Sequence, residues 1–206
     1  MYFKQPSIKI SESNKLYLSP KVFIDKSNKN NKVIATENIK DGETLIEEYP
    51  IINLFGEKID DRDVLFLKKL ILSSENELYP RDINEFKRTR MTKKIFDKIK
   101  NTNKSLQKYF DQYDTNFIEH YYAKHIFNSF EGYEYGPLYL PNIAKLNHSC
   151  NPNTKFVFNK DTGIMRLIAT RNINKREEIS DSYITNKKII DHKEYLNDHY
   201  GFICNC

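Results

Sequence analysis

The feature that most constrains this 206-residue chain is its hydrophobic period, which changes twice along the sequence. Between residues 15 and 52, short apolar runs such as Val33-Ile34-Ala35 alternate with Ser, Asn and Asp-Gly turns, which is the pattern of β-strands. Between 60 and 128, apolar residues recur every three to four positions, which indicates helices. Strand-like runs then return after residue 138. Strands interrupted by a helical insert predict an α+β fold.

The same patterns assign individual elements. Strands are expected at 16–18, 22–24, 33–35, 44–46, 138–140, 156–158, 165–169 and 178–184. The insert should contain three or four helices, separated by Pro80 and the polar run 101–104, with the last helix at 115–127. A final helix is expected at 187–199. The Asp41-Gly42 pair predicts a tight turn between two strands.

Composition limits the function classes. A net charge of +5 without a dense basic face argues against direct sequence-specific nucleic-acid binding. The sequence has neither a signal-peptide pattern nor an apolar stretch of about 18 residues, so we expect no membrane span, and an intracellular protein. We expect one domain and a monomer. Three cysteines indicate thiols or metal ligands before disulfides.

One short segment concentrates chemically useful side chains. Hydrogen-bonding residues and a thiol follow apolar Ile143 and Leu146 in the string Asn147-His148-Ser149-Cys150-Asn151-Pro152-Asn153. From composition alone, two interpretations remain open. The string is a polar loop in which Asn and Ser bond their own backbone and Pro sets a bend, or it is part of a functional site.

This string resembles the signature of the SET-domain protein lysine methyltransferases, and other segments agree in the correct order. The run 36–43 resembles the family's strand and turn after its cofactor loop. The run 176–183 resembles the strand that ends in the active-site tyrosine, and 200–206 resembles the start of the cysteine-rich post-SET segment. Phe127-Asn128-Ser129-Phe130 further resembles the SET-and-MYND (SMYD) branch, although three cysteines are too few for a MYND zinc module.

The resemblance implies a SET fold, in which small β-sheets surround a knot-like core where the signature meets the strand of Tyr183. It divides the chain into N-terminal SET strands (1–56), a helical insert (57–127), a C-terminal SET core (128–186) and the start of a post-SET segment (187–206). The implied cofactor is S-adenosylmethionine, and the implied partner is a protein or peptide lysine, in histones or elsewhere. Cofactor and lysine are expected to enter from opposite sides.

The resemblance also implies roles for single residues. Tyr183 is the tyrosine at the methyl-transfer site, where it also contacts the cofactor, and Tyr200 is the second aromatic wall of the lysine channel. The implied cofactor contacts come from the Asn147 amide, the His148 backbone, Asn128 near the amino-acid end, stacking of Phe202 on adenine, and the backbones of Ala144 and Lys145. Tyrosine suits such a channel because its hydroxyl orients an amine while its ring excludes water.

The expected cofactor loop departs from the family pattern. Asn30-Asn31-Lys32 stands where Gly-x-Gly is usual, and glycine there allows close backbone approach. Lys29 and Asn31 are the candidates for cofactor contacts in this loop. This departure keeps an alternative open, a catalytically inactive SET-fold module for protein interaction. A purely structural zinc or interaction domain is a second alternative.

The cysteines match part of a zinc site. The resemblance implies that Cys150, Cys204 and Cys206 are three of four thiolate ligands of a structural zinc, with the fourth not in this chain. Because structural zinc is four-coordinate, water, His or another residue would have to complete the tetrahedron. Three small thiols without metal are the alternative. Placement in the nucleus, the cytoplasm or both is expected.

Overall fold

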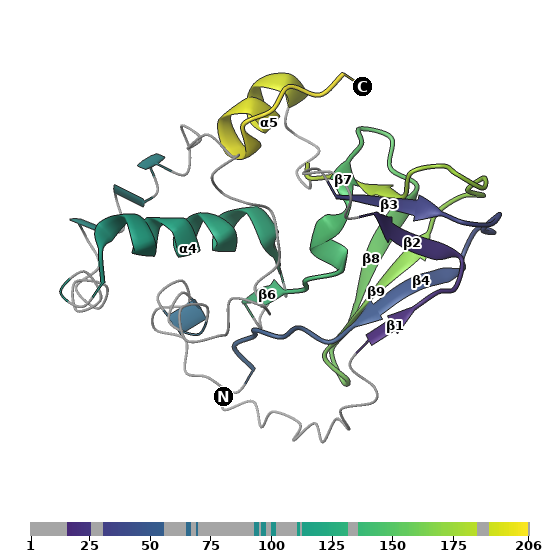
Figure 1. Cartoon of the computed structure of the whole chain (residues 1–206), viewed down its shortest axis with the longest axis horizontal. Coiled ribbons are helices and arrows are strands. Elements are labelled where there is room, and N and C mark those ends of the chain that lie inside the picture. The colour runs from purple at the N-terminus through teal and green to yellow at the C-terminus, as the bar shows by residue number, and fades with distance from the viewer. Residues whose placement is uncertain are drawn as a thin grey trace.

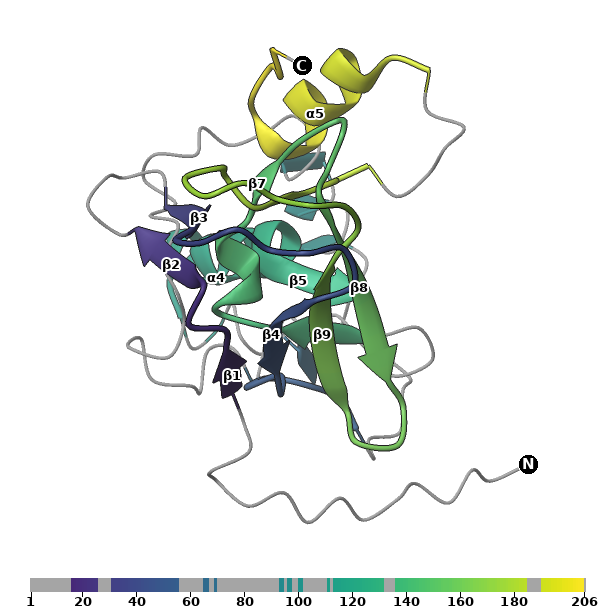
Figure 2. The same cartoon turned by 90° about the vertical axis from the view of Figure 1, so that its right-hand side faces the viewer.

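The structure of the chain, a computed structural model, describes residues 16–25, 31–55, 113–131, 136–184 and 190–205, with isolated positions between 65 and 111. Most strands gather on one side of the molecule, and helix α4 (Thr115–Asn128) lies on the other (Figure 1). Helix α5 (His192–Tyr200) lies at the same end as β7 (Asn147–His148), as Figure 2 also shows. The expected α+β arrangement is confirmed.

The largest sheet is antiparallel, with strand order β1-β4-β9-β8. Its strands are β1 (Leu16–Leu18), β4 (Thr44–Glu48), β9 (Ile164–Ala169) and β8 (Thr154–Asn159). Two-stranded antiparallel ribbons pair β2 (Val22–Asp25) with β3 (Lys32–Ala35), and β5 (Ser129–Glu131) with β6 (Pro137–Tyr139).

Alternation of side chains along β9 shows how this sheet covers the core. Met165, Leu167 and Ala169 are buried, whereas Arg166 is exposed and its guanidinium bonds Glu47 of β4. The β8–β9 hairpin closes at Gly163, whose φ is +69°. A Cβ there would lie 2.8 Å from the Phe55 ring, so the turn requires glycine for conformation and for space.

The knot-like core expected from the signature is present. Strand β7 pairs in parallel with β10 (Ser180–Asp181), in the register Asn147 to Ser180 and His148 to Asp181. The Ser149 backbone N–H donates to the Asp181 carbonyl at 2.8 Å, which extends the contact. Two segments separated by about thirty residues thus meet directly before Tyr183.

Three sequence-based expectations need adjustment. The last helix begins at His192 rather than at 187, because the Asp191 side chain accepts the Glu194 backbone N–H at 2.9 Å and caps the helix there. The strand expected at 178–184 is shortened to β10, because its partner β7 has only two residues. The Asp41-Gly42 turn forms, with φ +81° at Gly42, but it joins β3 and β4, which belong to different sheets.

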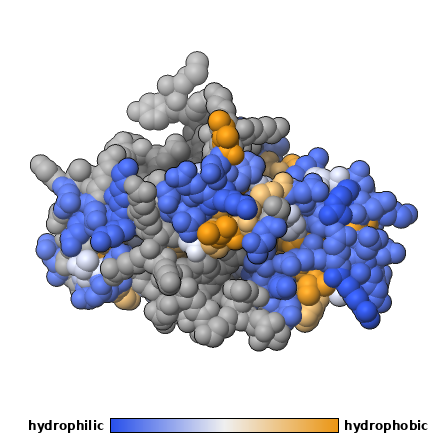
Figure 3. Space-filling model, turned by 90° about the horizontal axis from the view of Figure 1, so that it is seen from above, coloured by the Kyte–Doolittle hydropathy of each residue, from blue (hydrophilic) through white to orange (hydrophobic). Residues whose placement is uncertain are grey.

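Most of the expected insert, including the break at Pro80, lies outside the described residues; its last helix is confirmed as α4. Within the described part of the chain, no helix is both long and apolar enough to cross a bilayer. Viewed from the α5 end, the described surface is mostly hydrophilic, with small hydrophobic patches (Figure 3).

Candidate functional site

Tyr183 is hydrogen-bonded through both its side-chain hydroxyl and its backbone N–H. Its hydroxyl donates to the Leu146 carbonyl at 2.7 Å, and its backbone N–H donates to His148 Nδ1 at 3.0 Å. Both partners belong to the signature region, which the β7–β10 pair brings alongside. Because the hydroxyl proton is committed to Leu146, the phenol oxygen offers its lone pairs to whatever lies beside it.

An aromatic group surrounds Tyr183. Its ring centroid lies 4.8 Å from that of Tyr200 and 6.1 Å from that of Phe202, which it meets nearly edge-on. Tyr200 ends α5, and Gly201 then adopts a left-handed φ of 76° that reverses the chain direction. The structure therefore brings Tyr183, Tyr200 and Phe202 together from two segments of sequence.

A second group of contacts around the signature is polar. The Asn147 side-chain nitrogen donates to the Asn31 carbonyl at 3.0 Å and to Glu178 Oε1 at 2.7 Å. Lys32 Nζ lies 3.8 Å from Glu178 Oε2. Both amide protons of Asn147 are thus committed to protein acceptors, so a cofactor contact by this nitrogen requires exchange of one bond. A cofactor contact by Asn147 is therefore easier through its backbone than through its side-chain amide.

The loop without glycines has ordinary backbone geometry where it is described. Outside glycine, Arg176 is the one described residue with positive φ, so Asn31 and Lys32 need no left-handed conformation. Asn31 is buried, with 8% of its surface exposed. Lys29 and Asn30 lie outside the described residues. The conformational argument for glycine therefore does not apply to Lys32.

The other cofactor candidates lie in buried positions next to the signature. Ala144 and Lys145 belong to the short 3-10 helix η3 (Ile143–Lys145), and Asn128 ends α4. The Glu48 carboxylate accepts the backbone N–H groups of residues 142 and 143, which fixes the start of η3. Burial raises the pKa of Glu48. The Lys145 side chain is occupied by Asn142 Oδ1 at 3.3 Å.

Two thiols lie at a spacing that suits a metal. Cys150 Sγ and Cys204 Sγ are 3.6 Å apart, and tetrahedral zinc with bonds of about 2.3 Å holds its sulfurs about 3.8 Å apart. His148 Nε2 lies 3.3 Å from Cys150 Sγ and completes a three-residue cluster. Cys206 lies outside the described residues. The described thiols fit two corners of a zinc tetrahedron.

His148 fits this cluster as a donor rather than as a ligand. Its Nδ1 accepts the Tyr183 N–H, so in the neutral ring the proton resides on Nε2 and points toward Cys150. Burial, followed by the nearby His192, lowers the pKa of His148, which favours that neutral ring. A protonated Nε2 cannot bind a metal, and its N–H stabilises a thiolate. His148 thereby links Tyr183 to the thiols.

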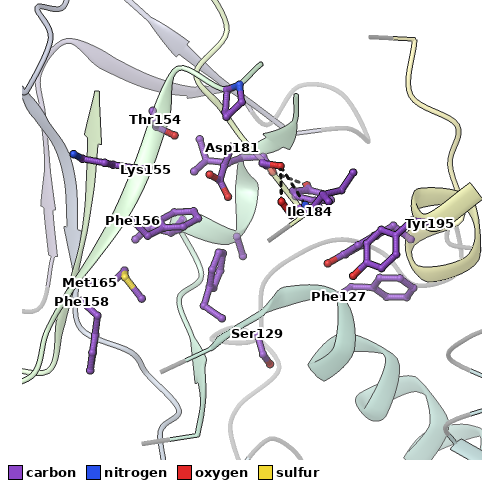
Figure 4. Close-up of a pocket in the computed structure, with 18 residues that line it drawn as sticks. Phe127, Ser129, Thr154, Lys155, Phe156, Phe158, Met165, Asp181, Ile184 and Tyr195 are labelled. Atoms are coloured by element: carbon purple, nitrogen blue, oxygen red, sulfur yellow. Dashed lines mark hydrogen bonds between the residues drawn. The ribbon is translucent and has the colours of Figure 1, made fainter. Parts of the chain in front are cut away.

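A cavity of about 720 Å³ opens beside Tyr183 (Figure 4). Both Tyr183 and Tyr200 line it, whereas Asn31, Asn147, His148 and Phe202 do not. Most of its wall is apolar or aromatic, from Phe127, Phe130, Ile143, Ala144, Leu146, Phe156, Phe158, Met165, Ile184 and Tyr195. Tyr183 therefore lines this cavity while its N–H and hydroxyl contact the signature region.

Asp181 is a residue of this cavity that sequence reasoning missed. Burial raises the pKa of its carboxyl to about 7, and the Ser182 backbone offsets this only in part. Alternation along the expected strand could have indicated it, because Asp181 precedes Tyr183 by two positions and residues two apart face the same side. The Phe130–Phe156 pair, with centroids 5.1 Å apart, was missed as well, because it joins β5 to β8.

The site can place an elongated side chain against the oxygen of Tyr183 and keep water away from it. The aromatic walls accommodate a hydrocarbon stem and favour a cationic end. Across the tyrosines, the signature backbone and Phe202 offer polar contacts and a stacking surface to a second molecule. The arrangement suits group transfer between two molecules that approach from different sides.

Comparison with known sequences gives consistent matches. A model of the SET domain family matches residues 30–184. The SET domain-containing protein L678 of Acanthamoeba polyphaga mimivirus is 32% identical over 197 residues, which cover 90% of this chain and 74% of that protein. Histone-lysine N-methyltransferase SMYD3 of Homo sapiens is 37% identical over 91 residues, which cover 41% of this chain and 21% of that protein.

Solved structures share the fold. The SET domain of LSMT bound to lysine and AdoHcy superposes with a TM-score of 0.62 at 11% identity, covering 94% of this chain and 55% of that chain. Rubisco LSMT bound to AdoMet gives a TM-score of 0.63 at 13% identity, and the match covers 90% of this chain and 52% of that chain. The chain thus spans about half the length of these structures.

Proposed function

This chain belongs to the SET domain family, and we propose that it is an S-adenosylmethionine-dependent protein lysine N-methyltransferase. The observation that carries the proposal is the position of Tyr183, whose hydroxyl and N–H are both bonded to the signature region while its ring borders an aromatic cavity. A methyl transferase needs such a boundary, because its donor and acceptor must meet at one point without sharing a pocket.

The polar side is the proposed cofactor site. The backbones of Asn147 and His148, the Phe202 ring and the buried Asn31 would hold S-adenosylmethionine, with Lys29, Asn128 and the backbones of Ala144 and Lys145 as further contacts. Ala144 also lines the cavity, so its backbone would meet the cofactor where the two sites adjoin. When bound, S-adenosylmethionine supplies a methyl group on a sulfonium, which an unprotonated amine takes by in-line displacement. Half-buried Phe202 fits this role because Tyr183 and His148 pack beside its ring and orient it.

The cavity is the proposed lysine channel. Its apolar walls remove water from the incoming amine, which lowers the amine pKa and favours loss of a proton to solvent. The Tyr183 oxygen, with its own proton donated to Leu146, accepts an N–H of that amine and aims its lone pair. Tyr200 closes the channel from α5 and packs against Tyr183. These residues act by position and electrostatics, without a strong base.

We also propose a structural zinc held by Cys150, Cys204 and Cys206 together with a fourth ligand. The sulfur spacing of 3.6 Å supports it, and the His148 Nε2–H would stabilise the Cys150 thiolate. Zinc there would contribute folding energy to the segment that carries Phe202. Metal analysis and chelation test this assignment, and thiols without metal are the competing interpretation.

The proposed substrate is a protein or peptide lysine, in histones or in other proteins of the nucleus or cytoplasm. The experiment is transfer of labelled methyl from S-adenosylmethionine to histones and to cell extract by the zinc-loaded protein, with mass-spectrometric mapping of modified residues. Methyl on lysine Nε, lost in Tyr183→Phe, is the expected result. Cofactor binding without transfer to any substrate would instead support the SET-fold interaction module that Asn30-Asn31-Lys32 first suggested.

A further inference from the structure

Among the described residues that line the mostly apolar and aromatic cavity, Asp181 is the one acid. Asp181 is the last residue of β10, and its backbone carbonyl is bound by the Ser149 N–H at 2.8 Å, so its position is fixed by the main chain. Figure 4 shows its side chain directed between Phe156 on one side and Tyr195 and Phe127 on the other. A carboxylate in such surroundings loses hydration and gains little in return.

The cavity lining offers this carboxylate little charge compensation. Among the described residues that line the cavity, Lys155 is the one cation, and it is exposed and points away from Asp181 (Figure 4). The other titratable groups of the lining are the phenols of Tyr183, Tyr195 and Tyr200. Acids with raised pKa values cluster at functional sites, and a cationic ligand would compensate the charge of this one.

We propose that Asp181 receives the ammonium group of the incoming lysine, which then loses a proton before methyl transfer, and that Asp181 makes the cavity select amines that still carry N–H bonds. This inference deepens the proposed function, since it names a specificity residue for the same site. A carboxylate accepts hydrogen bonds from unmodified, monomethylated and dimethylated ammonium, each of which has at least one N–H. Trimethylated lysine has none, so it keeps the charge but loses the bond.

The selection should also affect the product. The Asp181 carboxylate binds an amine more tightly when the amine has more N–H donors. Each added methyl group removes one donor and therefore weakens the contact with Asp181. We therefore expect the wild-type protein to favour unmodified and monomethylated lysine as acceptors. Replacement of Asp181 by an apolar side chain of similar length should shift the products toward higher methylation states.

The binding test uses four small probes at pH 8, namely Nα-acetyl-lysine amide, its Nε-monomethyl and Nε-trimethyl forms, and Nα-acetyl-norleucine amide, which has the same shape without charge. NMR titrations measure the affinity of each probe without methyl transfer. The wild-type protein should bind lysine roughly tenfold more tightly than norleucine, as expected for a charge-assisted hydrogen bond. The monomethyl form should likewise bind more tightly than the trimethyl form.

Three variants separate the causes. Asp181→Leu removes charge and acceptor and should bring the lysine-to-norleucine ratio to about one. Asp181→Asn keeps the shape and one acceptor, so it should give an intermediate ratio and confirm that the fold is intact. Lys155→Met, on the same cavity but pointing away, is the matched control and should leave all ratios unchanged.

Two results would overturn the proposal. One is a wild-type protein that does not distinguish lysine from norleucine, or that binds none of the probes. The other is a ratio that survives in Asp181→Leu. Failure of the proposed function is distinguishable, because it would abolish methyl transfer and leave the probe affinities of the wild-type protein as predicted here.

Discussion

The two sides of Tyr183 differ in how well their polar and charged groups are paired within the protein. On the polar side, the Asn147 side-chain nitrogen bonds Asn31 and Glu178, and Lys32 lies near the same carboxylate, so these groups have partners within the protein. On the cavity side, the partly buried Asp181 lines a mostly apolar and aromatic cavity, and burial raises the pKa of its carboxyl. The polar side is therefore built before any ligand arrives, whereas the cavity side holds a charge that a ligand would neutralise.

This difference has an energetic meaning. A satisfied polar network stabilises the fold and orients the backbone of the signature, which suits a site that must hold a cofactor in one position. A buried acid without a cation destabilises the fold, and such strain is tolerated where it serves binding. Mutations on the two sides should thus change stability in opposite directions.

The largest expected effect is on methyl transfer, when Tyr183 is changed. Tyr183→Phe keeps the ring but removes the oxygen that orients the amine, so methyl transfer should fall by roughly 100-fold to 1000-fold. Cofactor affinity, measured by calorimetry, should change little because the polar side is untouched. Tyr195→Phe, in the same cavity, is the matched control and should retain most activity. Equal losses in both variants would contradict the role given to Tyr183.

The polar side should be intolerant of added charge. Asn147→Asp places a second carboxylate where Asn147 now donates to Glu178 at 2.7 Å, and it also loses the bond to the Asn31 carbonyl. We expect the free energy of unfolding to fall by about 3 kcal/mol, and cofactor affinity to fall with it. Urea titration measures the first quantity. Asn147→Ala should be milder, and the reverse order would argue against this network.

The C-terminal segment serves both sides, since it carries Tyr200 and Phe202. Cys150→Ser should remove bound zinc, lower the free energy of unfolding by roughly 2 kcal/mol and weaken cofactor binding about tenfold. Elemental analysis, thermal unfolding and calorimetry report these three changes. Asn151→Ala, an exposed neighbour, serves as the control. If the wild-type protein contains no zinc and chelators leave its unfolding unchanged, the metal assignment is wrong.

The cavity side should gain stability when its acid is removed. The Asp181 pKa is about 7 in the fold and 3.8 ordinarily, so from pH 4 to 7 the unfolded chain has already lost the proton that the folded chain keeps. Wild-type stability therefore falls as the pH rises through this range, and Asp181→Asn escapes the loss. The variant should match wild type below pH 4 and exceed it by roughly 2 kcal/mol at pH 8. Denaturant titrations at both pH values decide this.

Much of this division could be predicted from the sequence. The period changes indicated the α+β order, and the signature, Tyr183, Tyr200 and Phe202 were found through family resemblance. Strands and helices could be predicted because they follow from local hydrophobic patterns. The site residues could be predicted because the family motifs occur here in the same order. The contact of β7 with β10 was likewise expected, because the resemblance implied that those two segments meet, whereas their parallel pairing is known only from the structure.

The remainder depends on contacts that no local pattern encodes. The Asn147 nitrogen is committed to Asn31 and Glu178, which lie 116 and 31 residues away, so its availability to a cofactor could not be judged from the string. The tautomer of His148 follows from the Tyr183 N–H, a three-dimensional contact. Alternation could have placed Asp181 on the same side as Tyr183, but its burial and the cavity beside it are known only from the structure.

The most direct test of the two-sided account is an amide NMR titration of the labelled protein, first with S-adenosylhomocysteine and then with Nα-acetyl-lysine amide. The account predicts that the first ligand shifts signals of Asn31, Asn147, His148 and Phe202. The second should shift signals around Phe130, Phe156 and Asp181, and Tyr183 should respond to both. Overlapping sets of shifted signals, or a lysine probe that perturbs only the polar side, would contradict the division at Tyr183.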